Sequence, residues 1–246
     1  MIYNKNVTMK ILAIIPVRGG SKGIPQKNIR AFNGQPLIAL SLEAAKQSSV
    51  VDRVIVSTES QEIADISIAH GAEVPILRPT EMAGDSSPVI DAVIHMLDYL
   101  RDREQYEPTH ILLLQATSPL RRASDIDAAV QLYQERGADS LVSVCRTENA
   151  LYFKREDDVL ESVVDGYRTR GNRQELPVCY KLDGSMIYLV RTDLFRETRS
   201  FFSGRLVGYE VERWRAVDLD EIQDFVIGEL IHKHRDEIAK DIQNFK

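Results

Sequence analysis

The chain has 246 residues and a net charge of −6 at pH 7, with 43% hydrophobic and 28% charged residues. This length fits one α/β domain, and the acidic balance argues against a general nucleic-acid-binding protein or one that binds anionic membranes. No apolar run has transmembrane length, and the N-terminus lacks the apolar core of a signal peptide, so we expect no membrane partner, no nucleic-acid partner and a cytoplasmic location.

The hydrophobic pattern predicts strands alternating with helices. In chain order these are strand 11–15, helix 37–45, strand 53–57, helix 61–70, strand 73–77, helix 89–100, strand 109–115, helix 124–136, strands 139–145, 184–190 and 206–211, and a closing helix 222–234. Because it contains Pro75, strand 73–77 is expected at an edge of the sheet. Ser124 is a candidate N-cap for the helix over 124–136. The alternation predicts an α/β fold with a mostly parallel sheet and helices on both faces. We expect one domain over residues 9–246, preceded by a disordered extension over 1–8.

The alternation breaks over residues 147–180, which are polar apart from short apolar pieces such as 159–164. We interpret this excursion as an arm through which the chain forms a homodimer. The alternative is a long surface loop, although loops of this length without a role are uncommon. Cys145 and Cys179 are expected to be buried thiols, as is usual in a reducing compartment.

The loop over residues 16–28 follows the first predicted strand and carries three glycines and three cations. We expect the glycines to adopt positive φ and to let the backbone approach a ligand. Clustered cations beside such backbone amides at the carboxyl end of a strand predict a polyphosphate site. The alternative is a mobile turn with solvated cations. Neither the P-loop spacing nor the dinucleotide fingerprint G-x-G-x-x-G is matched.

The string IPVRGGSKGIPQKN (15–28) resembles the signature of the acylneuraminate cytidylyltransferases, the CMP-sialic acid synthetases. The resemblance implies a Rossmann-like sheet of the nucleotide-diphospho-sugar transferase type. It also implies that the loop binds the triphosphate of CTP, with Lys27 and Asn28 near the α-phosphate and with Arg18 and Lys27 acting in catalysis. The implied nucleotide-binding residues are Arg18, Gly20, Ser21, Lys22, Lys27 and Asn28.

A second stretch, LQATSPLR (114–121), follows the most apolar predicted strand. From its spacing alone, this stretch can equally be interpreted as a loop that leads into a helix and is stabilised by side-chain hydroxyl groups. It resembles the family's second motif, with Ala116 in place of a proline, and this resemblance implies that Gln115 contacts the sugar acid.

The segments 172–177 and 180–188 resemble the family's Arg-Gln-x-x-Pro segment and the strand that follows it. Arg173 could bind the carboxylate of a sugar acid through its planar fork, and Tyr188 is expected in the same pocket. Lys181 and residues 183–185 depart from the family pattern, which leaves the identity of the sugar acid open. Two adjacent aromatics, Phe201 and Phe202, resemble a pair that lines the pocket for the acylamino group. The alternative for them is core packing.

Asp218 and Asp220 stand two residues apart on an extended segment, so both carboxylates can reach one hard cation. Acidic pairs are also common on solvated surfaces. Beside a triphosphate site the pair predicts Mg²⁺ binding, and the family carries its metal ligands here. By the resemblance, Asp220 joins Arg18 and Lys27 as a catalytic residue.

Together these motifs predict a Mg²⁺-dependent N-acylneuraminate cytidylyltransferase. Its reaction would convert CTP and a nine-carbon 2-keto sugar acid into the CMP-sugar and pyrophosphate. A close alternative is an enzyme for legionaminate or pseudaminate, which the departure at residues 183–185 favours. A more distant alternative is a non-catalytic nucleotide-binding regulator on the same fold. The intact cation set and acidic pair argue against that regulator.

Overall fold

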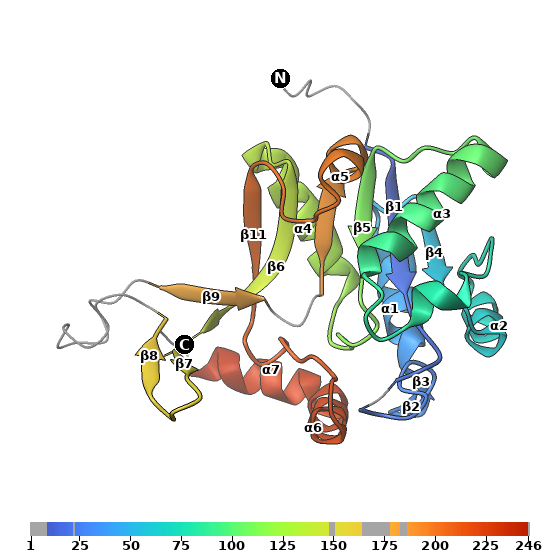
Figure 1. The fold of residues 1–246 in the computed structure, drawn as a ribbon. Helices are drawn as coiled ribbons and strands as arrows, with labels where there is room; N and C mark the ends of the chain where they lie inside the picture. The colour runs from blue at the N-terminus through green and yellow to red at the C-terminus, as the bar shows by residue number, and fades with distance from the viewer. Residues whose placement is uncertain (1–8, 22, 148–150, 164–177, 183–185, 246) are drawn as a thin grey trace.

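The computed structural model describes residues 9–21, 23–147, 151–163, 178–182 and 186–245. Its centre is a mostly parallel sheet in the order β11-β6-β10-β5-β1-β4 (Figure 1). The strands are β1 (Ile11–Pro16), β4 (Arg53–Ser57), β5 (His110–Leu113), β6 (Ser140–Thr147), β10 (Tyr188–Arg191) and β11 (Leu206–Val211). β1 pairs in parallel with β4 and β5, and β6 with β11, whereas β10 is antiparallel to β5 and β6. The predicted α/β class is confirmed.

Helices cover both faces of the sheet (Figure 1). They are α1 (Leu37–Gln47), α2 (Gln61–Ala69), α3 (Val89–Glu104), α4 (Ala123–Arg136), α5 (Thr192–Thr198), α6 (Ile222–Lys233) and α7 (Arg235–Asn244). Side chains of β1 alternate between two buried clusters because successive residues of a strand point to opposite faces. Ile11, Ala13 and Ile15 join the cluster that includes α1 and α4. Leu12 and Ile14 join the cluster that includes α3 and α5.

A third, smaller cluster lies beside the loop that follows β1. It contains Ile24 from that loop, Phe32 from the hairpin β2 (Ala31–Phe32) and β3 (Gln35–Pro36), and Leu219 and Phe225 near and within α6. The rings of Phe32 and Phe225 meet edge to face at 5.2 Å. This apolar contact brings residues from the two ends of the chain together, and it fixes the segment around Leu219 against the loop.

Several expected boundaries are wrong for identifiable reasons. Residues 73–77 do not form a strand: only Glu73 bridges to Ile55, and Pro75, which has no N–H, prevents the ladder from continuing. The 3₁₀ turn η1 (Thr80–Ala83) follows this segment. The helix placed at Ser124 begins at Ala123, because Asp125 accepts the N–H of Arg122 at 2.8 Å.

The helix predicted over 222–234 is confirmed as α6, but it does not close the chain, because α7 follows it after His234. The short helix α5 is not predicted by the hydrophobic pattern. The excursion contains the hairpin of β7 (Tyr152–Lys154) and β8 (Leu160–Ser162), together with β9 (Cys179–Leu182), which pairs with the end of β6. These elements project from the body of the molecule (Figure 1). Residues 1–8 and 164–177 lie outside the described residues. Within the described part of the chain, no helix is long and apolar enough to cross a membrane.

Candidate active site

A cleft of about 230 Å³ lies where the segments following β1 and β5 meet. Residues 16–18 and 27–28 line one side, residues 115–117 another, and the segment 78–89 closes the third. Parallel strands present their carboxyl ends at this edge, which is where open α/β sheets bind ligands. The structure therefore brings the predicted phosphate loop and the predicted substrate loop together.

The loop after β1 is held by polar contacts from other elements. Glu59 accepts the N–H of Gly19 at 2.7 Å, and the amide of Asn28 donates to the carbonyl of Arg18 at 2.9 Å. The expected positive φ is wrong for Gly19 and Gly20. Gly23 is required for a steric reason, because a Cβ at this position would lie 2.4 Å from the carbonyl oxygen of Asp220. This glycine permits a close approach of two backbones.

Two predicted cations of the loop contact carboxylates that are distant in sequence. Arg18 forms an ion pair with Asp85 at 2.9 Å, and both side chains are partly exposed. Lys27 is mostly buried; its Nζ donates to the carbonyl of Leu219 at 2.5 Å and lies 3.6 Å from Asp220 Oδ1. Ser21 lines the cleft and Gly20 is exposed, whereas Lys22 lies outside the described residues.

The acidic pair lies against the loop that follows β5, because the N–H of Leu219 donates to the carbonyl of Thr117 at 3.1 Å. Asp218 Oδ1 is buried and accepts no hydrogen bond from the described residues. Burial, with the neighbouring charge of Asp220, raises the pKa of Asp218. Asp220 is exposed, with 74% of its side chain accessible.

A buried carboxylate oxygen that lacks a partner, next to a second carboxylate, fits a hard divalent cation. Within the described residues no group of three His, Cys, Asp or Glu side chains converges on one point. A cation here would therefore take its other ligands from phosphate oxygens and water, which is the usual arrangement for Mg²⁺ beside a nucleotide.

The predicted sugar-side residues are divided between two places. Gln115 lines the cleft. Tyr188, opposite Leu113 on the neighbouring strand, contacts the rings of Phe201 at 5.7 Å and Phe202 at 5.9 Å, and this aromatic cluster is separate from the lining of the cleft. Phe201 is buried in the core, as the alternative interpretation holds, while Phe202 is 52% exposed. Arg173 and residues 183–185 lie outside the described residues.

Sequence reasoning missed Arg78, which it placed in a polar loop without a role. Arg78 is buried, and its Nη2 donates to the carbonyl of Val17 at 3.3 Å and to Glu59 at 3.1 Å. Its Nε is buried and has no partner in the described structure. Arg78 lines the cleft together with Ser87. The available signal was an arginine following the apolar run at residues 74–77.

Comparison with protein families gives one match that spans most of the chain: the family described as cytidylyltransferase matches residues 12–239. A CMP-N,N'-diacetyllegionaminic acid synthase of Legionella pneumophila is 39% identical over 79% of this chain and 84% of its own length. The post-translational flagellin modification protein B of Campylobacter coli is 32% identical over 94% of this chain and 99% of its own. An N-acylneuraminate cytidylyltransferase of Escherichia coli is 33% identical over 92% of this chain and 53% of its own.

Solved structures share the fold at low sequence identity. A CMP:2-keto-3-deoxy-manno-octonic acid synthetase complexed with CTP superposes with a TM-score of 0.66 at 16% identity, covering 94% of this chain and 99% of the other. A 4-diphosphocytidyl-2C-methyl-D-erythritol synthase from Anaerococcus prevotii gives 0.65 at 11% identity, covering 92% and 97%. At such identities the likeness concerns the fold alone.

Proposed function

Because this chain belongs to the cytidylyltransferase family and is an enzyme of that class, we propose that it transfers CMP from CTP to a nine-carbon 2-keto sugar acid. The single observation that supports this proposal is a cleft lined by Arg18, Lys27 and Asn28, in which Lys27 also lies 3.6 Å from Asp220 Oδ1 and donates to the carbonyl of Leu219. Lys27 thus connects cations suited to a triphosphate with the carboxylates proposed to hold a metal ion.

In the proposed reaction the anomeric hydroxyl oxygen of the sugar acid bonds to the α-phosphorus of CTP. The bond from that phosphorus to the oxygen bridging to the β-phosphorus breaks, pyrophosphate leaves, and the hydroxyl proton passes to solvent. The transition state is loose and highly charged, so the protein acts mainly by positioning and by charge stabilisation.

Arg18 and Lys27 bind the phosphates in this proposal, and Asn28 fixes the loop through its bond to the Arg18 carbonyl. Mg²⁺ held by Asp218 and Asp220 would neutralise charge on the phosphate oxygens. Arg18 is paired with the exposed Asp85, and triphosphate binding can replace this weak surface pair. Lys27 lies beside Asp220, so its ammonium group is at the edge of the proposed metal site.

Two acceptors are proposed for the first tests. N-acylneuraminate is the acceptor of the family signature. N,N'-diacetyllegionaminic acid is favoured by the Legionella relative, whose 39% identity exceeds the 33% of the Escherichia coli N-acylneuraminate cytidylyltransferase. Pseudaminate is the third acid to be tested, because a Campylobacter jejuni pseudaminic acid cytidylyltransferase is 29% identical to this chain.

The test is pyrophosphate release from CTP with each purified acid, with the product identified by mass. We expect one acid to give a CMP-sugar and Mg²⁺ removal by a chelator to stop the reaction. If CTP binds but no acid supports pyrophosphate release, the proposed transfer to a nine-carbon 2-keto sugar acid is wrong. UTP in place of CTP is the matched control for nucleotide choice.

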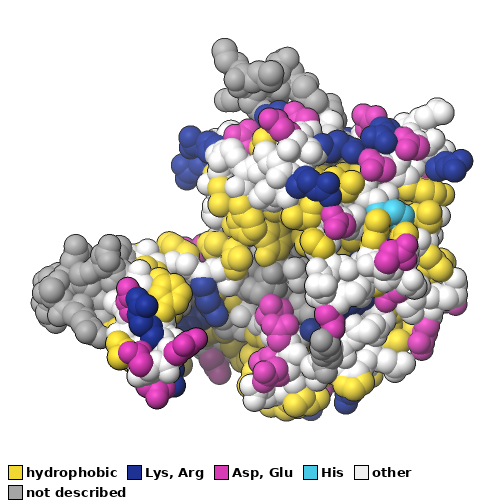
Figure 2. Space-filling model, in the orientation of Figure 1, with side chains coloured by type: hydrophobic (Ala, Val, Ile, Leu, Met, Phe, Trp, Pro, Cys, Tyr) yellow, Lys and Arg dark blue, Asp and Glu magenta, His cyan; other side chains and the backbone are white. Residues whose placement is uncertain are grey.

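We further propose that the enzyme is a cytoplasmic homodimer and that the arm over residues 147–180 contributes to the contact. Apolar side chains on the hairpin of β7 and β8 are exposed, Phe153 by 64% and Leu160 by 49%, on a part that projects from the body (Figure 2). Light scattering tests this: Phe153→Ser should shift the protein toward monomer. Ile68→Ser, at a residue that is 54% exposed on α2, should leave the mass unchanged. A monomeric wild type at micromolar concentration would contradict the proposal.

A further inference from the structure

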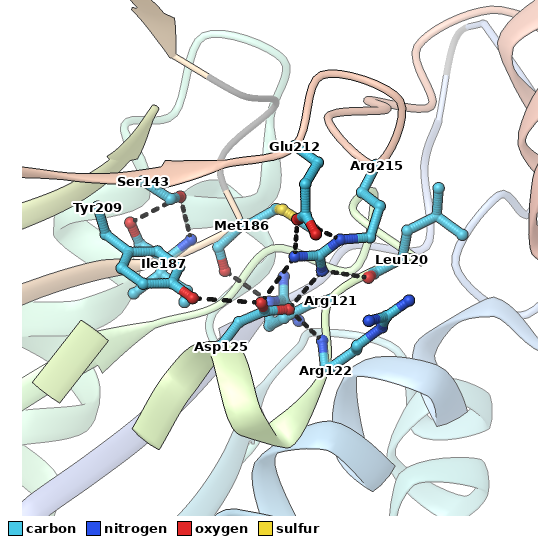
Figure 3. A network of polar contacts seen from close by, with 10 residues as sticks. All are labelled: Leu120, Arg121, Arg122, Asp125, Ser143, Met186, Ile187, Tyr209, Glu212 and Arg215. Carbon is cyan, nitrogen blue, oxygen red and sulfur yellow. Dashed lines mark hydrogen bonds and ion pairs between the residues drawn. The ribbon is translucent and has the colours of Figure 1, made fainter. Parts of the chain in front are cut away.

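A buried polar network joins the start of α4, the loop after β5 and the segment after β11 (Figure 3). At its centre Arg215 donates to both carboxylate oxygens of Asp125, in the first turn of α4, at 2.6 and 2.9 Å. Each of the two side chains is only 5% exposed. Arg215 also donates to Glu212 at 2.8 Å and to the carbonyl of Leu120 at 3.4 Å, and the hydroxyl of Tyr209 donates to Asp125 at 3.4 Å.

A second buried arginine, Arg121, joins the two segments that carry the predicted sugar-side residues Gln115 and Tyr188. Arg121 donates through Nε to the carbonyl of Met186 and through Nη2 to the carbonyl of Gln115, both at 2.5 Å, and through Nη1 to Ser41 at 2.9 Å. Met186 stands two residues before Tyr188. Arg121 therefore links the loop that carries Gln115 to the segment that leads into the strand of Tyr188; its bond to Met186 is drawn in Figure 3.

The segment from Arg215 to Leu219 is fixed to the loop after β5 at both of its ends. At one end Arg215 binds Leu120 and Asp125; at the other, the N–H of Leu219 donates to Thr117 at 3.1 Å. Asp218 lies between these two anchors. Its buried Oδ1 has no partner in the described structure, so the place of this carboxylate depends on the backbone that the two anchors hold.

We infer that Arg215, through its two-pronged bond to Asp125, is a positioning residue that sets the place of Asp218 in the site. This inference rests on the proposed function, in which Asp218 binds Mg²⁺. Burying an ion pair costs desolvation, and an apolar pair of similar volume is often as stable. The directional fork adds geometry rather than stability, since an arginine–carboxylate pair fixes both the distance and the plane of its partners.

The experiment compares Arg215→Lys, Arg215→Met and Asp125→Asn with Arg53→Met. Arg53 is the matched control because it also pairs with two carboxylates, Glu73 and Glu104, but at the amino end of β4, away from the cleft. The readouts are the Mg²⁺ concentration for half-maximal rate, the KM for CTP, and Mn²⁺ binding with CTP followed by water-proton relaxation, which reports the protein-bound ion independently of turnover.

For the Arg215 and Asp125 variants we expect the half-saturating metal concentration and the Mn²⁺ dissociation constant to rise about 10-fold to 100-fold, as for other groups that orient metal ligands. The KM for CTP at saturating metal should change less than the metal constants. Arg53→Met should lower thermal stability while both metal constants stay at the wild-type value. Arg215→Lys keeps the charge and loses the fork, so it remains informative if Arg215→Met does not fold.

Wild-type metal constants in a folded Arg215→Lys would overturn the inference. So would an equal loss of metal binding in Arg53→Met, because the effect would then follow stability alone. Failure of the proposed function looks different: the wild type itself would give no CMP-sugar with any acid and no relaxation enhancement with Mn²⁺ and CTP.

Discussion

The ion pairs in the cleft differ from those behind it in burial and in number of bonds. Arg18–Asp85 is a single contact between side chains that are 34% and 46% exposed, and Lys27 lies 3.6 Å from an Asp220 that is 74% exposed. Arg215 and Asp125, in contrast, are both almost completely buried and joined by two hydrogen bonds. Exposed pairs contribute little to stability, whereas breaking a buried pair leaves an uncompensated charge.

This difference separates groups that a substrate can recruit from groups that hold the site in place. A triphosphate can replace Asp85 at Arg18 with little loss of stability, because solvent already screens that pair. The buried network has no such freedom, since each donor of Arg121 and Arg215 has a fixed acceptor. Mutations in the two regions should therefore change different measured quantities.

The largest effect is expected from Asp220→Asn, which removes a charge from the proposed metal site and keeps its shape. We expect kcat to fall about 10³-fold to 10⁴-fold, since loss of metal assistance costs several kcal/mol. Added Mg²⁺ should restore part of the loss, because the defect is partly one of occupancy. Asp102→Asn, at an exposed aspartate on α3, is the control. A mutant with the wild-type Mg²⁺ dependence would remove Asp220 from the site.

Substitution of the two adjacent phenylalanines should affect different quantities, the stability for Phe201 and the activity for Phe202. Phe201→Ala should lower the free energy of unfolding by about 3–5 kcal/mol, because its ring packs in the core against Phe195 at 4.7 Å. Phe202→Ala should change it by about 0.5 kcal/mol or less and should raise the KM for the sugar acid. Urea unfolding and acceptor kinetics check both. An unchanged acceptor KM in Phe202→Ala would confine that ring to a surface role.

Truncation of a cleft cation should act on the rate and leave the fold intact. For Arg18→Ala or Lys27→Ala we expect a loss of about 2.7–4 kcal/mol in transition-state stabilisation, seen mainly in kcat. Arg101→Ala is the matched control for Arg18, because Arg101 is also half exposed and paired with aspartates, but on α3. An unchanged kcat in a folded Arg18→Ala would contradict the phosphate assignment.

The smallest effect on the rate is expected for His110 in the core, at the start of β5. Burial, with a smaller effect of Arg191, lowers the pKa of His110 to about 4. The unfolded chain therefore takes up this proton near pH 6.5 and the folded chain only near pH 4, so the free energy of unfolding falls by about 3 kcal/mol as the pH drops across that interval.

In His110→Asn this part of the acid destabilisation should disappear, as urea unfolding at a series of pH values would record. The rate per folded molecule should not change, because His110 lies at the amino end of β5 and the cleft lies beyond the carboxyl ends of the strands. An unchanged pH profile of stability would mean that folding does not lower the pKa of His110.

Local patterns were sufficient to predict the alternation of strands and helices, the loop at 16–28 and the acidic pair. Buried strands and amphipathic helices each follow from a period of two or 3.6 in the sequence, and the loop carries its chemistry in consecutive residues. The sequence-based expectation failed at residues 73–77, where the apolar run is typical of a strand but Pro75 leaves only a single bridge.

Only the tertiary structure decided which distant groups meet. Arg215 and Asp125 are 90 positions apart, and Lys27 and Leu219 are 192 apart, so no local pattern relates them. Likewise, Phe201 and Phe202 look alike in the sequence, but one ring packs against Phe195 and the other faces solvent. The sequence by itself determined the chemistry that the chain carries. The packing of the sheet determined which of those groups face one another, because contact between distant residues depends on the path of the whole chain.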